Sequence, residues 1–395
     1  MAKKITPMNT AAIMSIFFIA MGIGTITPAL ATIIAAFPNL SISTIYLVST
    51  LPSLMVIPAS LLAGAVVGSK VKYKTLASIG ILLFAVAGVA PAFANDFTVV
   101  LIERAVFGIG LGILSPLGNA LVLGVYSEDK RAGMLGAGTL MMNIGGIVLQ
   151  FLGGAMAGFG WNFAFYPHAL GIISLVLVLF FLPEPPKMVV PEGAEKPKIK
   201  VPASIWVLSI LFGLVMFISY PLLMGMSILL TVNSIGGTTA SAVVLSFFTI
   251  GGMIGGAVFA PSYKVLKRFI VGVGLALMAI GAALVIYTFN IVLITIGMTL
   301  VGIGFSYLMP SVFMIIGMTS SPQAFPMCSS ILMALMNLFA FLYTFWSKLI
   351  TNITGDALMM PMVAGMAIAI IGAVVFFIVN PFPKMPAAPA APIEE

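Results

Sequence analysis

The chain has 395 residues, of which 61% are hydrophobic and only 7% are charged, and its formal net charge at pH 7 is +7. A soluble domain carries about 25% charged residues, so this composition excludes a water-soluble fold and indicates a protein whose solvent is lipid. With one histidine, one cysteine and no paired carboxylates inside the apolar segments, the sequence offers neither a metal site, a cofactor site nor a nucleophile with its base, and we expect no enzymatic activity.

Long apolar segments separated by short polar breaks predict membrane-spanning helices. A spanning helix needs about 20 apolar residues, whereas a β-barrel would show short alternating segments. Taken in chain order, the predicted spans are 11–31, 45–67, 75–94, 98–125, 132–157, 163–182, 204–231, 239–261, 269–288, 291–317, 325–348 and 358–380. The sequence therefore predicts an all-α integral membrane protein with twelve transmembrane helices.

The basic residues predict the orientation. With both termini in the cytoplasm, 15 of the 17 Lys and Arg residues fall on the cytoplasmic side, and only Arg104 and Lys348 do not. Positive charge retained inside is the established orienting signal, so the net charge reflects topology and does not indicate a nucleic-acid partner. We expect a multi-pass protein of the cell membrane. The alternative of a cleaved signal peptide, with "ALA" at 29–31 as its cleavage site, would leave eleven spans and misplace the basic loops.

The two halves of the chain repeat each other at an offset of 194 residues. "GIGLGILSP" at 108–116 corresponds to "GIGFSYLMP" at 302–310. Six spans per copy is an even number, so both copies enter the membrane in the same direction, which predicts two six-helix bundles related by a parallel pseudo-twofold repeat. Further pairs at the same offset are Lys70 and Lys264, Lys74 and Arg268, Gly80 and Gly274, and Asn143 and Asn337.

Proline and charge without apolar periodicity mark the segment between the halves, and the end of the chain, as extended or disordered. The predicted organisation is an N-terminal six-helix bundle at 1–182, a cytoplasmic linker at 183–203, a C-terminal six-helix bundle at 204–380 and a disordered cytoplasmic tail at 381–395.

Three motifs carry a resemblance to a known family. The loop after the second predicted helix reads "GAVVGSKVKYK" at 64–74, the fourth helix holds the phrase Leu101, Arg104, Gly108 and Gly112, and the fifth contains "LQFLGG" at 149–154, followed by "GWN" at 160–162. On these motifs, and over all twelve helices, the chain resembles the major facilitator superfamily of secondary transporters.

The resemblance implies the two-bundle fold, alternating access, a small-molecule substrate and a monomer. It also implies that Gly64, Lys70, Lys72 and Lys74 form a gating loop, although Gly68 and Ser69 stand where the family has an aspartate and an arginine. In proton-driven drug exporters the fifth-helix motif reads Gly-Pro-x-x-Gly-Gly, of which this chain keeps the glycine pair.

Two ionisable residues lie within the fourth predicted helix. An arginine inside the membrane costs roughly 2.5–3.5 kcal/mol by insertion scales, so Arg104, roughly 9 Å from the outer end, is a candidate for substrate binding. Snorkelling to the lipid headgroups and a structural hydrogen bond to the first helix are the alternatives. Its neighbour Glu103 is the candidate for proton coupling, with a simple interfacial glutamate as the alternative.

A periodic polar stripe marks the predicted eleventh helix. Ser330, Asn337 and Thr344 recur in steps of seven, with Lys348 four residues further, so all four share one helix face. Such a stripe is costly unless it faces protein or water, and we expect it to line a cavity with Asn143 and Gln150 of the fifth helix. Asn143 should lie opposite Asn337 near the midplane, and interhelical hydrogen bonding is the alternative. Further candidates for phenol donors to this cavity are Tyr220 and Tyr307.

Two transport mechanisms follow. The first is proton-coupled export of a small amphipathic compound, which the apolar interior and the resemblance favour. The second is uptake or exchange of a small organic anion held between Arg104 and Lys348. A sensor or a lipid-scrambling protein on the same scaffold would differ from both by showing no solute flux in sealed vesicles.

Overall fold

The computed structural model describes residues 5–185, 201–321 and 324–382, and within these ranges the regular secondary structure is helical apart from one isolated bridge between Val67 and Val71. Most of the expected linker at 183–203 and of the expected tail at 381–395 lies outside the described residues.

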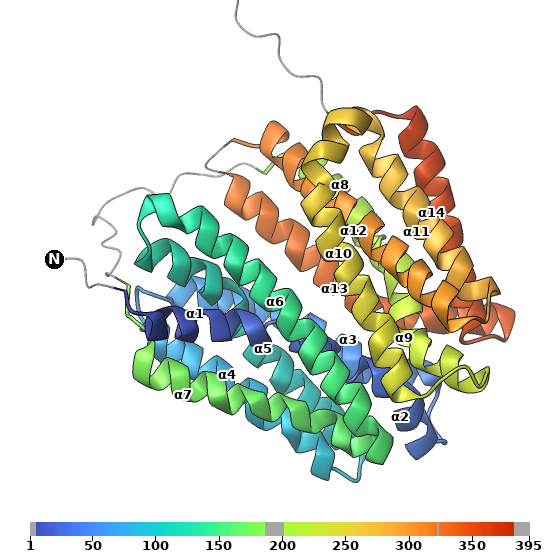
Figure 1. The fold of residues 1–395 in the computed structure, drawn as a ribbon, viewed down its shortest axis with the longest axis horizontal. Helices are drawn as coiled ribbons and strands as arrows, with labels where there is room; N and C mark the ends of the chain where they lie inside the picture. Colours follow the sequence, from blue (N-terminus) through green and yellow to red (C-terminus); the bar gives the residue numbers. More distant parts are fainter. Residues whose placement is uncertain (1–4, 186–200, 322–323, 383–395) are drawn as a thin grey trace, which may run out of the picture.

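The helices form two groups that lie side by side, one blue to green and one yellow to red (Figure 1). The first group consists of α1 (Pro7–Ile19), α2 (Leu30–Ala36), α3 (Ile42–Val66), α4 (Tyr73–Val89), α5 (Phe97–Val125), α6 (Glu128–Met156) and α7 (Gly171–Phe181). The second consists of α8 (Ala203–Gly213), α9 (Met216–Val232), α10 (Thr238–Leu266), α11 (Ile270–Tyr287), α12 (Ile291–Thr319), α13 (Phe325–Thr354) and α14 (Met359–Ile378).

These helices make twelve spans across the described residues. The first span is broken, because α1 and the segment that ends in α2 meet at 42°. The apolar stretch Thr238–Tyr287 has 50 residues. As one helix it would be roughly 75 Å long at 1.5 Å per residue, more than twice the thickness of a bilayer. The chain reverses near Lys267, whose φ is 47°, so α10 and α11 are two spans. The predicted all-α, twelve-helix fold is confirmed.

The repeated glycine phrase is explained by close helix packing. A Cβ on Gly110 of α5 would lie 2.9 Å from the carbonyl oxygen of Gly80 on α4, and a Cβ on Gly304 of α12 would overlap the carbonyl oxygen of Gly274 on α11. Both pairs keep the offset of 194 residues. The two halves therefore use the same glycines to bring equivalent helices together.

The helix starts repeat in the same way. The Asp96 carboxylate accepts hydrogen bonds from the backbone N–H groups two and three residues later, at the start of α5. The Asn290 side chain does the same at the start of α12, 194 residues further. Each residue satisfies N–H groups that have no partner within the helix.

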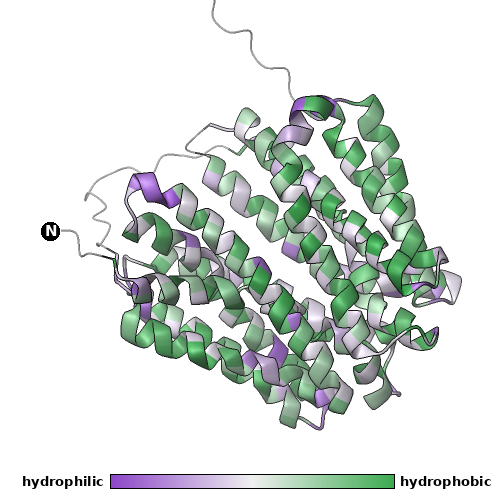
Figure 2. Ribbon diagram, viewed as in Figure 1, coloured by the Kyte–Doolittle hydropathy of each residue, from purple (hydrophilic) through white to green (hydrophobic). Residues whose placement is uncertain are grey.

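The outer surface is apolar. Large side chains such as Leu62, Phe180 and Ile371 are exposed, as is expected of helices that contact lipid tails. Hydrophilic residues gather mainly toward the helix ends (Figure 2). We call the end that carries Lys70–Lys74, Lys130–Arg131 and Lys264–Arg268 the basic face, and the opposite end the distal face.

Candidate substrate cavity

A cavity of about 240 Å³ lies between the two groups of helices, and we call it the central cavity. Its walls come from the broken first span, α3 and α6 on one side and from α9, α10, α12 and α13 on the other. It is lined by Met21, Ile23, Gly24, Thr27, Ser49, Gly146, Gln150, Met216, Ser219, Tyr220, Leu223, Met224, Leu245, Phe248, Thr249, Phe305 and Met336. None of these side chains is charged, and four of them are methionines.

The break in the first span shapes one wall of this cavity. A Cβ on Gly22 would overlap the Phe84 ring, so α4 approaches the break too closely for a side chain. At the break the Gly22 carbonyl accepts hydrogen bonds from the backbone N–H of Thr25 at 3.2 Å and from the Thr25 hydroxyl at 2.7 Å. A Cβ on Gly24 would lie 3.7 Å from the amide nitrogen of Gln150 on α6. Substrate sites of transporters are typically built around such discontinuous helices.

The central cavity continues toward the basic face through two further cavities, of about 290 Å³ and about 420 Å³. The first of these, the middle cavity, shares Met21 and Ile23 with the central cavity. The second, the basic-side cavity, shares Asn119 and Asn337 with the middle cavity and reaches Gly64 at the end of α3. Together they form a path from the centre of the protein to the basic face.

At the distal face the two groups of helices are closed against each other. The hydroxyls of Thr50 on α3 and Thr344 on α13 form a hydrogen bond of 2.7 Å. The Ser227 hydroxyl on α9 donates to the Pro28 carbonyl at 2.6 Å and accepts from the backbone N–H of Ala31. The structure is thus open toward the basic face and closed toward the distal face.

Arg104 is fully buried within α5. Its Nε donates to the carbonyl of Val48 at 2.8 Å, and its guanidinium carbon lies 4.1 Å from the centre of the Phe107 ring. The two Nη atoms have no hydrogen-bond partner among the described residues. Arg104 therefore supports α3 directly behind Ser49, which lines the central cavity, but it is not among the residues that line the three cavities.

His168 lies beside this group, in the 3-10 helix Trp161–Leu170. One ring nitrogen lies 2.8 Å from the carbonyl oxygen of Phe165 and the other 3.3 Å from that of Gly22. The ring also packs edge-on against Phe107, with centroids 4.9 Å apart. His168 thus connects the break in the first span with the sixth span, Trp161–Phe181.

Glu103, which directly precedes Arg104 in α5, is half-buried, and its Oε2 has no partner among the described residues.

Several predicted residues lie along the path. Gln150 and Tyr220 line the central cavity, Asn337 lines the middle and basic-side cavities, and Gly64 lines the basic-side cavity. Ser330 lines the basic-side cavity as well, so the polar face of α13 does point toward α3.

Other predicted residues lie elsewhere. Thr344 continues the polar face of α13 but belongs to the distal closure, where it bonds Thr50. The Tyr307 hydroxyl bonds Ser262 at 2.8 Å inside the second group of helices. Lys348 is exposed one turn beyond Thr344. The structure therefore places none of these side chains on the three cavities.

The expected pairing of Asn143 with Asn337 across a cavity is not what the structure shows. Asn143 is half-buried on α6 and lines none of the three cavities, whereas Asn337 lines two of them. Seven-residue spacing determines the direction in which a side chain points from its helix. It does not determine which neighbouring helix or cavity the side chain meets at each depth in the membrane.

The predicted gating loop lies at the basic face. Lys70 and Lys72 are exposed, and Lys74 is half-buried at the start of α4. Glu184, which the sequence analysis did not single out, accepts hydrogen bonds from the backbone N–H groups of Tyr73 and Lys74, at 2.7 and 3.1 Å. A carboxylate at a helix N-terminus is stabilising, so Glu184 attaches this loop to the end of the sixth span.

Sequence reasoning also missed the polar residues of α5 and α6 that line the middle cavity. They are Ser115, Asn119 and Thr139. An asparagine within an apolar helix is the signal that could have identified Asn119, because an amide facing lipid would be costly.

Comparisons with known proteins agree with this architecture. The sequence profile of the Major Facilitator Superfamily matches residues 12–324. The Quinolone resistance protein NorA of Staphylococcus aureus is 24% identical over 176 residues, which cover 44% of this chain and 44% of NorA. The chain thus aligns with less than half of the length of this curated relative.

Solved structures match over nearly the whole chain. A bacterial homologue of the human lysosomal transporter Spinster, in an inward-facing and unoccupied conformation, is 17% identical, with a TM-score of 0.76 over 95% of this chain and 97% of that one. The nucleoside transporter NupG is 15% identical, with a TM-score of 0.77 over 93% of this chain and 99% of that one. At these identities the likeness concerns the fold. The profile match covers most of the sequence, and the chain belongs to the Major Facilitator Superfamily of transporters.

Proposed function

We propose that this transporter exports a small, amphipathic and mainly uncharged compound across the cell membrane by alternating access, with the basic face and both termini in the cytoplasm. One observation carries the proposal: the central cavity is lined mainly by methionine, aliphatic and aromatic side chains, with a few polar side chains and no charged one. With the basic face in the cytoplasm, the structure corresponds to the inward-facing arrangement.

The chemistry of the cavity limits the substrate. An ionised group that entered it would lose its hydration without meeting an opposite charge, which is strongly unfavourable. A few polar groups, among them Gln150, Ser219 and Tyr220, offer hydrogen bonds that would orient an apolar molecule. Methionine side chains are flexible and polarisable, so they suit a site that accepts more than one shape.

The middle cavity supports the amphipathic character. On the side of the central cavity that leads to the basic face, it adds the polar residues Ser115, Asn119, Thr139 and Asn337. A compound with an apolar body and a polar end would therefore find complementary surroundings for both parts, with the polar end toward the basic face.

Export and proton coupling rest on other observations. The similarity to NorA, whose name denotes quinolone resistance, favours export. Glu103 is the candidate proton carrier, because it is a half-buried carboxylate beside the buried Arg104 and its Oε2 has no described partner.

The second candidate function is transport of a small organic anion. It is favoured by the two Nη atoms of Arg104, which are buried donors without a described partner. A movement that exposed them to the central cavity would supply a charge-assisted contact to a carboxylate. Lys348, exposed beyond the distal closure, would then act only in an outward-facing state.

Transport by purified protein in liposomes under an imposed pH gradient tests these alternatives, with an uncharged amphipathic dye and the dicarboxylate succinate as probes. For proton-coupled export we expect Glu103→Gln to abolish the pH-dependent movement of the dye and Lys348→Gln to leave it unchanged. Transport of succinate that falls about 10- to 150-fold in Lys348→Gln or Arg104→Gln would instead favour the anion carrier. Dye transport without any pH dependence in the parent protein would contradict proton coupling.

A further inference from the structure

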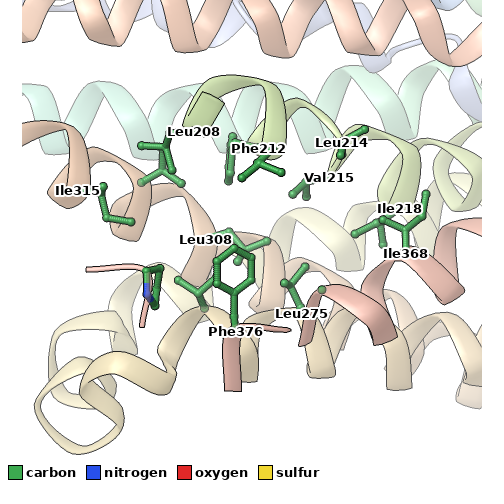
Figure 3. A pocket seen from close by; sticks show the side chains of 15 residues that line it. Leu208, Phe212, Leu214, Val215, Ile218, Leu275, Leu308, Ile315, Ile368 and Phe376 are labelled. Atoms are coloured by element: carbon green, nitrogen blue, oxygen red, sulfur yellow. The ribbon is translucent and has the colours of Figure 1, made fainter. Parts of the chain in front are cut away.

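A separate apolar pocket of about 130 Å³ lies within the second group of helices, between α8, α11, α12 and α14 (Figure 3). Its lining consists of Leu, Ile, Val, Phe, Gly and Pro residues only. Phe212 of α8 and Val215, between α8 and α9, face Leu275 of α11 and Phe376 of α14 across it (Figure 3). Apolar cavities of about 150 Å³ stay dry and bind benzene, so this pocket is suited to a short stretch of hydrocarbon.

The pocket opens to the outer surface between α8 and α14, near the basic face. Leu211 on its rim is 48% exposed, and Phe376 and Pro381 are half-buried. Other lining residues show that the pocket lies near the basic face of the membrane. Val271 is the second residue of α11, and Ile315 is four residues before the end of α12. Lipid tails of the leaflet at the basic face therefore have direct access to the pocket.

A cluster of exposed cations lies at this end of the second group, in the last turn of α10 and the connection to α11, and we call it the Lys264–Arg268 turn. Lys264, Lys267 and Arg268 are all exposed. No Asp or Glu occurs between residues 201 and 321, and Asp356, which precedes α14, lies toward the distal face. The positive charge at this turn is thus not balanced by a carboxylate in the described part of the second group.

Aromatic contacts connect the cluster to the pocket. The Arg268 guanidinium lies 4.5 Å from the centre of the Phe269 ring, and Phe269 packs on Phe377 of α14 with centroids 6.2 Å apart. Phe377 follows Phe376, which lines the pocket. Arg268 also precedes the pocket-lining Val271 by three residues, so the cations lie about one helical turn from the pocket, at the same end of α11.

We propose that this pocket and the Lys264–Arg268 turn form a binding site for one anionic phospholipid, with an acyl chain in the pocket and the phosphate at Arg268, Lys264 and Lys267. Basic residues at the membrane surface attract anionic lipids, and basic sites between spanning helices hold their headgroups. The apolar pocket adds a contact that a free phosphate lacks.

The site has a consequence for transport, because it adjoins the break between α8 and α9. Val215 lines the lipid pocket, and the next residue, Met216, lines the central cavity. A lipid that fills the space between α8 and α14 fixes the position of α8, and through it the first turn of α9. We therefore expect the bound lipid to stabilise the arrangement that is open toward the basic face.

Thermal-shift titration of the purified full chain in detergent tests the site. We expect dioleoyl phosphatidylglycerol to bind about tenfold more tightly than dioleoyl phosphatidylcholine, and sn-glycerol 3-phosphate to give no shift. Arg268→Gln should weaken the phosphatidylglycerol affinity about fivefold, the effect of roughly one surface cation. Lys130→Gln is the matched control and should bind like the parent, because it removes an exposed cation of the basic face that belongs to α6 in the other group of helices. Equal affinity for the two lipids would overturn the proposal.

The acyl chain is tested separately. Val312→Phe fills the pocket and should remove the phosphatidylglycerol shift, whereas Val374→Phe, on a side chain of α14 that is 54% exposed and does not line the pocket, should not. If Val312→Phe does not fold, the parent protein still decides: phosphatidylglycerol with a photoreactive acyl chain should label α8, α12 or α14. Labelling confined to other helices, or full competition by oleate, would overturn the phospholipid site.

Discussion

Two amide side chains on α6, Gln150 and Asn143, differ in whether they line the central cavity. Gln150 is buried at the central cavity, and Asn143, two turns earlier on the same face, is half-buried and lines none of the three cavities. The seven-residue spacing predicted that both side chains lie on one face of the helix. It could not predict that Gln150 lines the central cavity and Asn143 does not, because that depends on the packing of the neighbouring helices.

We predict that Gln150→Ala weakens binding of the transported compound by about 2- to 13-fold, since a net hydrogen bond contributes roughly 0.5–1.5 kcal/mol. Asn143→Ala is the matched control on the same helix and should change the affinity less than about twofold. The KM for transport in liposomes, with the melting temperature as a check of folding, measures both. Equal losses in the two variants would contradict the assignment of the central cavity.

At the scale of the helices, some features follow from the local sequence, whereas others depend on tertiary contacts. The glycine repeat, the spans and the basic loops follow from composition and spacing. The break in the first span, predicted as one helix over 11–31, does not, because "MGIGTITPA" at 21–29 is apolar enough to read as continuous. α1 ends at Ile19, Gly22 packs against the Phe84 ring, and the Thr25 hydroxyl donates to the Gly22 carbonyl. The contact with α4 cannot be read from the first span alone.

The glycine contacts give a prediction for the helix pairs. Gly304→Ala should destabilise the protein by about 1–3 kcal/mol, because its Cβ would overlap the Gly274 backbone, which cannot rotate away. Gly110→Ala, with its Cβ 2.9 Å from the Gly80 oxygen, should destabilise in the same direction.

Gly136→Ala provides the control for this pair. A Cβ at that position meets nothing within 4 Å, so the change should be neutral or slightly stabilising, as expected for glycine replaced in a helix. Denaturation of the three variants in one detergent compares them. Equal melting temperatures for Gly304→Ala and Gly136→Ala would show that the α11–α12 contact is looser than the structure has it.

At the scale of the whole molecule, the distal closure includes a few neutral hydrogen bonds between the two groups of helices. Each such bond contributes only about 1 kcal/mol, so it can break when the halves rock. The family resemblance predicted alternating access, but it could not predict which face is closed or that Thr344 belongs to the closure. That assignment depends on the packing of α3 against α13, which the sequence alone does not give.

We predict that joining α3 to α13 blocks transport. In a Cys328→Ser background, Thr50→Cys with Thr344→Cys should form a disulfide under oxidation, because the two hydroxyl oxygens lie 2.7 Å apart. Transport should stop on oxidation and return on reduction, while each single cysteine variant continues to transport under both conditions. Continued flux in a fully crosslinked sample would show that the distal face does not open during the cycle.

The last prediction concerns access from the two sides of the membrane. In the same background, Asn119→Cys lies on the path to the basic face, whereas Ser227→Cys is buried in the distal closure. If the basic face is cytoplasmic, a membrane-impermeant thiol reagent should label Asn119→Cys in inside-out vesicles and spare it in intact cells. Ser227→Cys should resist labelling from both sides while the closure holds, and should become reactive from outside the cell when a transported compound drives the halves apart. Labelling of Asn119→Cys from the outside alone would reverse the orientation, and with it the direction in which this cavity delivers its substrate.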